Sequence, residues 1–210
     1  MFAAAKAGGE SALEAKHFQG PLEFPKYVSV SGYRVADDYY YHLGHTWVHL
    51  EPGGRVKIGV DDFISKVLGP AEVFGLPARG VTLGQGHAGW MWKRNGREAD
   101  VLSPLTGKVF LINRHAVENP GIVHDDPYGD GWLFVMEPIT PINVLNLNVL
   151  FSGNKSLKWM EEEFQEILKL MGPKYEKLAA TGGEPISDLF GRFPEIGWDR
   201  LVKTFLRTGG

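Results

Sequence analysis

The chain has 210 residues, which at roughly 150 residues per domain fits one domain with an appendage better than two equal halves. Its 43% of hydrophobic residues and six tryptophans can form a sizeable core, and its net charge of -3 gives no basic excess for binding nucleic acid. The complete absence of cysteine excludes a disulfide framework, a thiolate metal site and a cysteine nucleophile.

Residues 1–20 are rich in alanine, and their apolar runs are short because Lys6, Glu10, Glu14 and Lys16 interrupt them. A signal peptide needs a continuous apolar stretch of about 7–15 residues, and a membrane-spanning helix needs about 20. We therefore expect a flexible N-terminal tail, no membrane span and a cytoplasmic protein.

Residues 21–150 are expected to form a mainly β domain. Short runs of β-branched and aromatic residues alternate there with turns rich in glycine and proline, such as Glu51-Pro52-Gly53-Gly54. The clearest predicted strands are Tyr27–Val30, Tyr39–Tyr41, Thr46–Leu50, Val56–Val60, Val109–Ile112 and Trp132–Met136.

Two short helices are expected within this β region. One is predicted over Asp61–Leu68, where Asp61 or Asp62 can cap the helix and Phe63, Val67 and Leu68 recur on one side. A second is predicted over Arg114–Glu118.

Residues 151–210 are expected to form a C-terminal helical extension. After Asn154, apolar residues recur at steps of three and four up to Met171, and Gly172-Pro173 ends the predicted amphipathic helix. A last helix is predicted over Glu195–Leu206. We expect the apolar stripes to cover the β domain, because an exposed stripe would promote aggregation, although a docking surface for a partner helix is the alternative.

The region from Tyr41 to Pro138 resembles the H protein of the glycine cleavage system. Six motifs carry the resemblance, and they occur in the family's order. They are His45-Thr46-Trp47-Val48, Ile58–Phe63 leading to Leu68-Gly69, Leu76-Pro77, Ser103–Val109, Val117-Glu118-Asn119-Pro120 and Asp125–Leu133. The resemblance implies a flattened β-sandwich of the barrel-sandwich hybrid type, which agrees with the predicted short strands.

In this family a lysine at the tip of a β-hairpin carries lipoate, about seven residues before the conserved Ser-Pro. Counting back seven residues from Ser103 leads to Gly96. The pair Asn95-Gly96 is a strong signal for a two-residue hairpin turn, so the same glycine is expected at the tip. The carrier lysine is therefore expected to be replaced by a turn glycine.

Lys93 is the lysine nearest to this tip, but it is expected to lie on the hairpin arm opposite Glu98. Its neighbours Trp92 and Arg94 differ from the acidic and small residues around the family's carrier lysine. No lipoate or other cofactor is therefore expected, and lipoate on Lys93 is the alternative.

The same hairpin is the predicted partner-binding site. Its residues combine aromatic and basic side chains, which suit an acidic pocket on a protein. They are Trp90, Trp92, Lys93, Arg94, Asn95, Gly96 and Arg97. The alternative is a solvated tip whose two tryptophans only pack on the sandwich.

Other clusters of polar residues have structural interpretations. His42, His45 and His49 are interpreted as strand histidines, and Asp125, Asp126 and Asp130 as part of a turn, so no metal site is expected. Gly84–Gly89 lacks the residues of a phosphate-binding loop, and no nucleophile elbow occurs.

The sequence thus predicts an accessory protein without a catalytic site of its own. In this hypothesis a non-lipoylated H-protein-like subunit docks its hairpin on a larger enzyme of the glycine-cleavage or a lipoate-related kind. One alternative is a lipoylated carrier that shuttles aminomethyl or acyl intermediates. Another is a small-molecule sensor, but no cluster of polar residues in the sequence indicates a ligand site.

Overall fold

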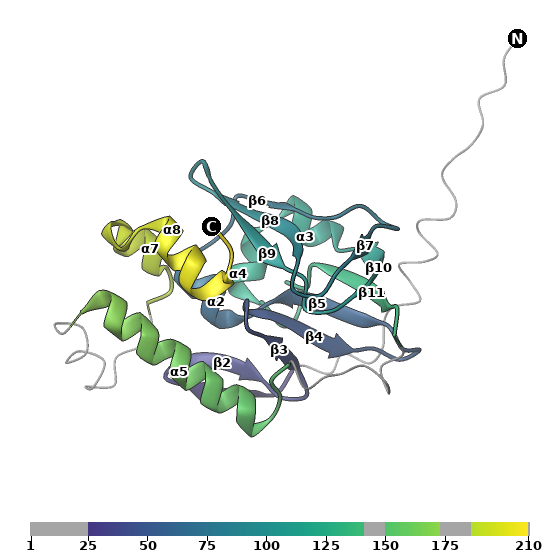
Figure 1. Ribbon diagram of the computed structural model, residues 1–210, viewed down its shortest axis with the longest axis horizontal. Helices are drawn as coiled ribbons and strands as arrows, with labels where there is room; N and C mark the ends of the chain where they lie inside the picture. The colour runs from purple at the N-terminus through teal and green to yellow at the C-terminus, as the bar shows by residue number, and fades with distance from the viewer. Residues whose placement is uncertain (1–24, 141–149, 173–185, 210) are drawn as a thin grey trace, which may run out of the picture.

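The computed structural model describes residues 25–140, 150–172 and 186–209. Antiparallel β-sheets form the body of the molecule, and the C-terminal helices lie along one side of it (Figure 1). The predicted tail, residues 1–20, lies outside the described residues. The predicted flattened β-sandwich with a C-terminal helical extension is confirmed.

The largest sheet has six antiparallel strands in the order β3-β4-β5-β11-β10-β7. Its central strands are apolar and buried on both faces, so they form the middle of the core. The bounds are β3 Tyr40–His42, β4 Thr46–Leu50, β5 Val56–Val60, β7 Thr82–Leu83, β10 Gly107–Ile112 and β11 Phe134–Pro138. The strands predicted over Thr46–Leu50 and Val56–Val60 agree with β4 and β5.

Two smaller sheets complete the β structure. One is the hairpin of β1 (Tyr27–Val30) and β2 (Tyr33–Ala36). The other has the order β6-β8-β9, with β6 Val73–Gly75, β8 Ala88–Arg94 and β9 Arg97–Leu102. In this sheet β9 is an edge strand, so its outer backbone groups need partners from elsewhere.

The two predicted short helices are present as α2 (Asp62–Leu68) and α3 (Arg114–Glu118). Asp61 caps α2, because its side chain accepts a hydrogen bond from the backbone N–H of Ile64 at 2.9 Å. A further short helix, α4 (Gly121–Asp125), was not predicted. The turn that follows it is held by Asp126, whose carboxylate accepts hydrogen bonds from the backbone N–H groups of Gly129 and Asp130.

The C-terminal extension begins with the long helix α5 (Asn154–Met171), which ends at Gly172 as predicted. The helix predicted over Glu195–Leu206 is confirmed from Trp198 to Leu206, where α8 (Trp198–Leu201) continues directly into the π-helical turn η3 (Val202–Leu206), but it begins three residues later than predicted. Before it the chain forms α7 (Leu189–Arg192), which was not predicted, and the 3-10 turn η2 (Pro194–Ile196). Gly197 separates η2 from α8, and its positive φ of 89° is outside the helical region.

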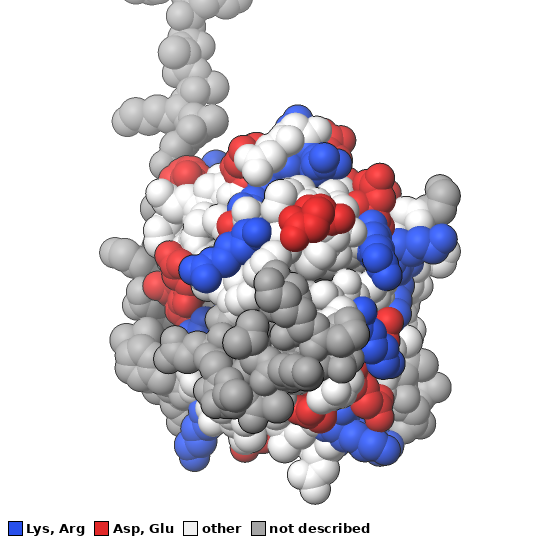
Figure 2. Space-filling model, turned by 90° about the vertical axis from the view of Figure 1, so that its left-hand side faces the viewer, with Lys and Arg blue, Asp and Glu red and all other residues white. Residues whose placement is uncertain are grey.

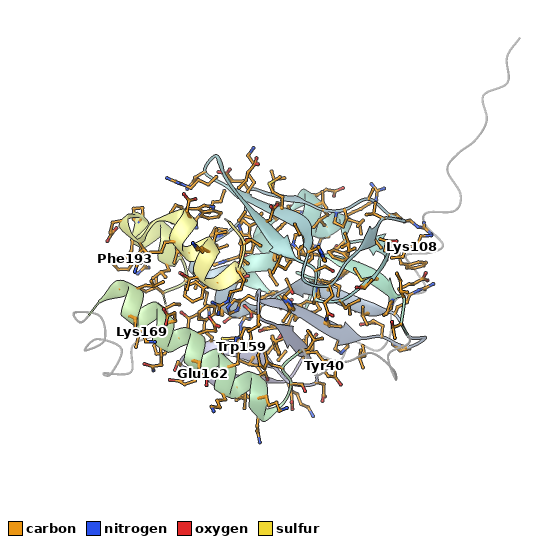
Figure 3. All side chains as sticks on the ribbon, in the orientation of Figure 1. Tyr40, Lys108, Trp159, Glu162, Lys169 and Phe193 are labelled. Carbon is orange, nitrogen blue, oxygen red and sulfur yellow. The ribbon has the colours of Figure 1, made fainter. Side chains whose placement is uncertain are left out.

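The extension and the sandwich share one hydrophobic core. Trp159, Met160 and Ile167 of α5 are buried in the same cluster as the strands, together with Trp198 and Phe205 near the C-terminus. Side chains fill the space between α5, where Trp159 is labelled, and the neighbouring strands (Figure 3). The extension therefore covers the sandwich as expected. No helix in the described ranges is long and apolar enough to cross a membrane.

Candidate partner-binding hairpin

The predicted hairpin is formed by β8 and β9, which pair from Ala88↔Leu102 to Arg94↔Arg97. Only Asn95 and Gly96 lie between the last pair, and both have positive φ angles, 50° and 70°. This geometry is that of a tight two-residue turn with a right-handed twist, for which Asn-Gly is the preferred sequence. Gly96 therefore stands at the apex, where it offers no side chain.

Lys93 lies on the arm of the hairpin and faces Glu98 on the opposite strand. Its Nζ is 3.1 Å from Glu98 Oε1, and its side chain is 39% exposed. A cross-strand ion pair of this kind at the surface contributes little to stability, but it directs the lysine across the sheet and not beyond the turn.

Trp90 and Trp92 are buried, which corrects the expectation that they belong to the exposed partner-binding surface. The ring of Trp90 packs edge to face against Phe134 at 5.0 Å, and that of Trp92 packs in the same way against Phe74 at 5.0 Å. Their indole N–H groups meet no acceptor within the described ranges. The two tryptophans hold the hairpin on the sandwich.

Arg94 is buried as well, so it does not add a free positive charge to the tip. Its Nη1 and Nη2 atoms each donate a hydrogen bond of 2.6 Å to the carboxylate of Asp188, and Nη1 also donates to the backbone carbonyl of Leu68. Burial raises the pKa of Asp188, but hydrogen bonds from Arg94 and Gly191 outweigh it and place this pKa below its ordinary value.

The C-terminal extension also covers the outer edge of β9. The indole N–H of Trp198 donates to the carbonyl of Glu98 at 3.1 Å, and the hydroxyl of Thr208 donates to the carbonyl of Asp100 at 2.7 Å. These carbonyls lie two residues apart, as outward-facing groups of an edge strand do. The extension thus satisfies an edge that would otherwise invite pairing with another chain.

A second contact between the extension and the sandwich lies in the interior, around His45. The imidazole stacks between Phe63 and Trp159, with ring centroids at 4.6 and 4.8 Å. Its Nδ1 is 2.8 Å from Asp61 Oδ2, and its Nε2 is 3.6 Å from Glu163 Oε2. His45 was predicted to be a strand residue. It lies instead in a turn, with a positive φ of 57°.

These groups form a buried network whose charges alternate. Glu163 accepts hydrogen bonds from Arg207 at 2.7 Å and from the indole of Trp159 at 3.0 Å. Burial lowers the pKa of His45, but attraction by Asp61, the hydrogen bond that Nδ1–H donates to its carboxylate, and the nearby Glu163 outweigh burial and raise the pKa to about 9. Burial also raises the pKa of Asp61. The proton shared by His45 and Asp61 is therefore retained at neutral pH, where His45 is an imidazolium.

The remaining histidines and the Asp125–Asp130 turn do not join this network. Nδ1 of His42 accepts a hydrogen bond from the backbone N–H of Gly44, and His49 pairs with Glu51 at 3.0 Å. Among the described residues no three His, Cys, Asp or Glu side chains are grouped so that they could hold a metal ion.

Comparison with known proteins identifies the fold that carries this hairpin. The family model described as "Glycine cleavage H-protein" matches residues 39–163, more than half of the chain. The chain belongs to the glycine cleavage H-protein family. The match contains the hairpin and His45 and ends at Glu163, so α7, α8 and η3 lie outside it.

Two relatives found by sequence agree with this assignment. A glycine cleavage system H protein of Marinobacter nauticus is 36% identical over 100 residues, which cover 48% of this chain and 77% of the relative. H protein 4 of Aquifex aeolicus is 33% identical over 137 residues, which cover 65% and 80%. A crystal structure of the H protein from Mycobacterium marinum is 28% identical, with a TM-score of 0.48, and covers 51% of this chain and 88% of its own.

Sequence reasoning missed several residues that surround the hairpin, namely Asp188, Phe190, Trp198 and Thr208. They lie about one hundred residues away along the chain, and no local pattern connects them to β8 or β9. One signal did exist for Arg94. It follows Trp90 and Trp92 at steps of two, and alternate residues of a strand face the same side of the sheet.

Proposed function

We propose that this H-protein family member is a non-lipoylated accessory subunit that docks its β8–β9 hairpin on a larger partner enzyme. The partner is of the glycine-cleavage or a lipoate-related kind, by analogy with the family. The subunit has no catalytic site of its own and serves to bring proteins together.

The observation that carries this proposal is the apex of the hairpin. Asn95 and Gly96 form the turn. Counting back from Ser103 predicts Gly96 as the position of the family's carrier lysine, and a glycine there has no amino group to carry lipoate. Lys93, the nearest lysine, is engaged with Glu98 across the sheet. These residues do not fit a lipoyl group at the tip, and the absence of cysteine leaves no thiol to replace it.

The docking surface is smaller than the predicted one. Trp90, Trp92 and Arg94 support it from inside, while Lys93, Asn95, Gly96 and Arg97 face outward. Two basic side chains around a rigid turn suit an acidic cleft on a protein. Charges of both signs are interspersed on the coloured part of the face that carries α7 and α8 (Figure 2). The partner is therefore recognised by the few residues of the hairpin tip and not by a large surface of one charge.

Affinity purification of the tagged full-length protein from extracts of its native host tests this proposal. Lys93→Glu with Arg97→Glu reverses both charges at the tip and is expected to remove the partner from the purified material. Lys155→Glu with Lys158→Glu, on the exposed face of α5, is the matched control and is expected to retain it. Equal recovery of every partner with both double variants would contradict docking through the hairpin.

The second candidate is a lipoylated carrier with lipoate on Lys93, shuttling aminomethyl or acyl intermediates. The partial exposure of the Lys93 side chain favours it, because the Nζ atom lies within reach of a modifying enzyme once the ion pair with Glu98 opens. Intact-mass measurement of the protein from its native host decides between the two. A lipoyl adduct on wild type that is lost in Lys93→Arg would replace our proposal with this one.

A further inference from the structure

The sandwich residues around Asp188, together called the Arg94 pocket, come from a different part of the chain than the segment that occupies the pocket. The walls belong to the part of the chain that matches the H-protein family, and they include Arg94, the carbonyl of Leu68 and Gly69. The occupant is the segment Asp188-Leu189-Phe190, which lies outside that part. The extension thus supplies the ligand of a site that the sandwich builds.

Gly69 makes room for this contact. Its φ is +73°, and a Cβ atom at this position would collide with the guanidinium of Arg94 and the carboxylate of Asp188. The residue therefore serves two purposes, as the cap of α2 and as the floor of the pocket. A side chain here would expel either the arginine or its acidic partner.

Arg94 needs a carboxylate in this pocket. Its side chain is only 9% exposed, and Asp188 is the one carboxylate that pairs with it among the described residues. A buried guanidinium without a counter-charge is strongly unfavourable. If α7 leaves the pocket, another acidic group must therefore take its place, or the arginine must move into water.

Phe190 connects this pocket to the exposed tip. Its ring lies 5.7 Å from the guanidinium carbon of Arg94 and 5.7 Å from that of Arg97, and it packs edge to face on Trp198 at 5.1 Å. The occupant therefore combines a carboxylate with an aromatic ring two residues later. It is held by one ion pair, whose aspartate is 28% exposed, and by Leu189 and Phe190, which are buried in the core shared with the sandwich. A partner segment must therefore supply an aliphatic and an aromatic side chain as well as a carboxylate.

We propose that the Arg94 pocket is a binding site for an acidic-aromatic segment of a partner protein, and that Asp188-Leu189-Phe190 is its intramolecular stand-in. A partner segment with the same chemistry exchanges with α7, so the charge of Arg94 stays compensated throughout. The vacated surface is continuous with Arg97 and the tip. This inference rests on the proposed function for the identity of the partner as a protein, and it adds what that protein presents.

The test uses a labelled synthetic peptide with the sequence of residues 186–192, Ile-Ser-Asp-Leu-Phe-Gly-Arg, and the full-length protein. In Asp188→Asn the internal segment loses its charge, so this variant is expected to bind the peptide at least about ten-fold more tightly than wild type by fluorescence anisotropy. The same peptide with Asn in place of Asp is expected not to bind. Adding Arg94→Gln to the variant is expected to abolish binding.

Hydrogen exchange of the wild-type protein provides a readout that needs no variant. Excess peptide is expected to accelerate exchange at Leu189–Arg192, and the Asn-containing peptide is expected to leave it unchanged. The inference is overturned if neither experiment distinguishes the two peptides. Neither experiment uses the natural partner. If the peptide binds but the tip variants keep their partner, only the proposed function is contradicted. If the tip variants lose their partner but the peptide does not bind, only the exchange at Arg94 is contradicted.

Discussion

The C-terminal extension is joined to the β sandwich by two ion pairs that lie in very different surroundings. His45 and Glu163 meet in the interior, where both side chains are buried and Asp61 and Arg207 continue the network. Arg94 and Asp188 meet at the rim, where the aspartate is partly open to water. The interior contact is suited to hold α5 permanently in place, and the rim contact is suited to open and close.

The burial of the two contacts explains this difference. Separating His45 from Glu163 would remove the imidazolium from beside a buried carboxylate, which carries a large penalty. At the rim the carboxylate of Asp188 can reach water within a short movement, whereas the buried Arg94 needs another acidic group in its place. The following predictions test whether the interior contact is the strong one and the rim contact the exchangeable one.

The largest effect is expected for His45→Ala. The substitution removes the ring between Phe63 and Trp159 and leaves the buried carboxylate of Asp61 without its counter-charge. The free energy of unfolding is expected to fall by about 3–5 kcal/mol, measured by urea denaturation. His49→Ala, at a half-buried histidine of β4, is the control and is expected to cost less than about 1 kcal/mol. Similar losses in both variants would break the comparison.

Stability is also expected to depend on pH through His45. The pKa of about 9 in the folded protein lies above the ordinary value of 6.5. The protonated imidazole therefore stabilises the fold fully below pH 6.5, and this contribution is lost as the pH rises through 9. The expected decline in the free energy of unfolding is at most about 3 kcal/mol. His45→Asn should show a flatter profile over the same range, and parallel profiles would contradict the assignment.

A smaller effect is expected at the rim. Asp188→Asn keeps the shape of the side chain but removes the charge that compensates Arg94, and a loss of about 1–2 kcal/mol is expected in urea denaturation. Asp199→Asn, on the exposed side of α8, should stay within about 0.5 kcal/mol of wild type. If Asp188→Asn proved as costly as His45→Ala, the rim contact would not be exchangeable in the way proposed.

The smallest effect is expected at the apex of the hairpin. Gly96→Lys places a lysine at the position that the sequence predicts for the family's carrier residue, but the φ of +70° is strained for a side chain with a Cβ atom. A cost of about 1 kcal/mol is expected, visible as a decrease in Tm of a few degrees. Gly96→Asn is the control, because asparagine tolerates this conformation better. Equal costs for both substitutions would mean that something other than the turn geometry limits this position.

The hairpin shows how far local patterns lead. Asn95-Gly96 predicts a two-residue turn, and that prediction is confirmed by the pairing of Arg94 with Arg97. The alternation along Trp90, Trp92 and Arg94 could also have placed the arginine on the inner side. The sequence interpretation gave more weight to its charge than to its position, and so expected it at the surface.

The C-terminal extension shows where local patterns end. The predicted periodicity of α5 and its end at Gly172 are confirmed, because the spacing of apolar residues in an amphipathic helix shows which face is buried. The helix predicted over Glu195–Leu206 begins only at Trp198, because its apolar stripe did not reveal that Gly197, with its positive φ, interrupts the helix. Short helices depend on packing more than on propensity.

The sequence by itself determined the family, the β sandwich, the tight turn at Asn95-Gly96 and the amphipathic helix α5. Each of these is encoded in neighbouring residues, through backbone preference and periodic burial. Only the tertiary structure decided that Asp188 compensates Arg94 and that His45 lies between Asp61 and Glu163. These partners are distant in the chain, and the value of a buried charge depends on which groups the fold places around it.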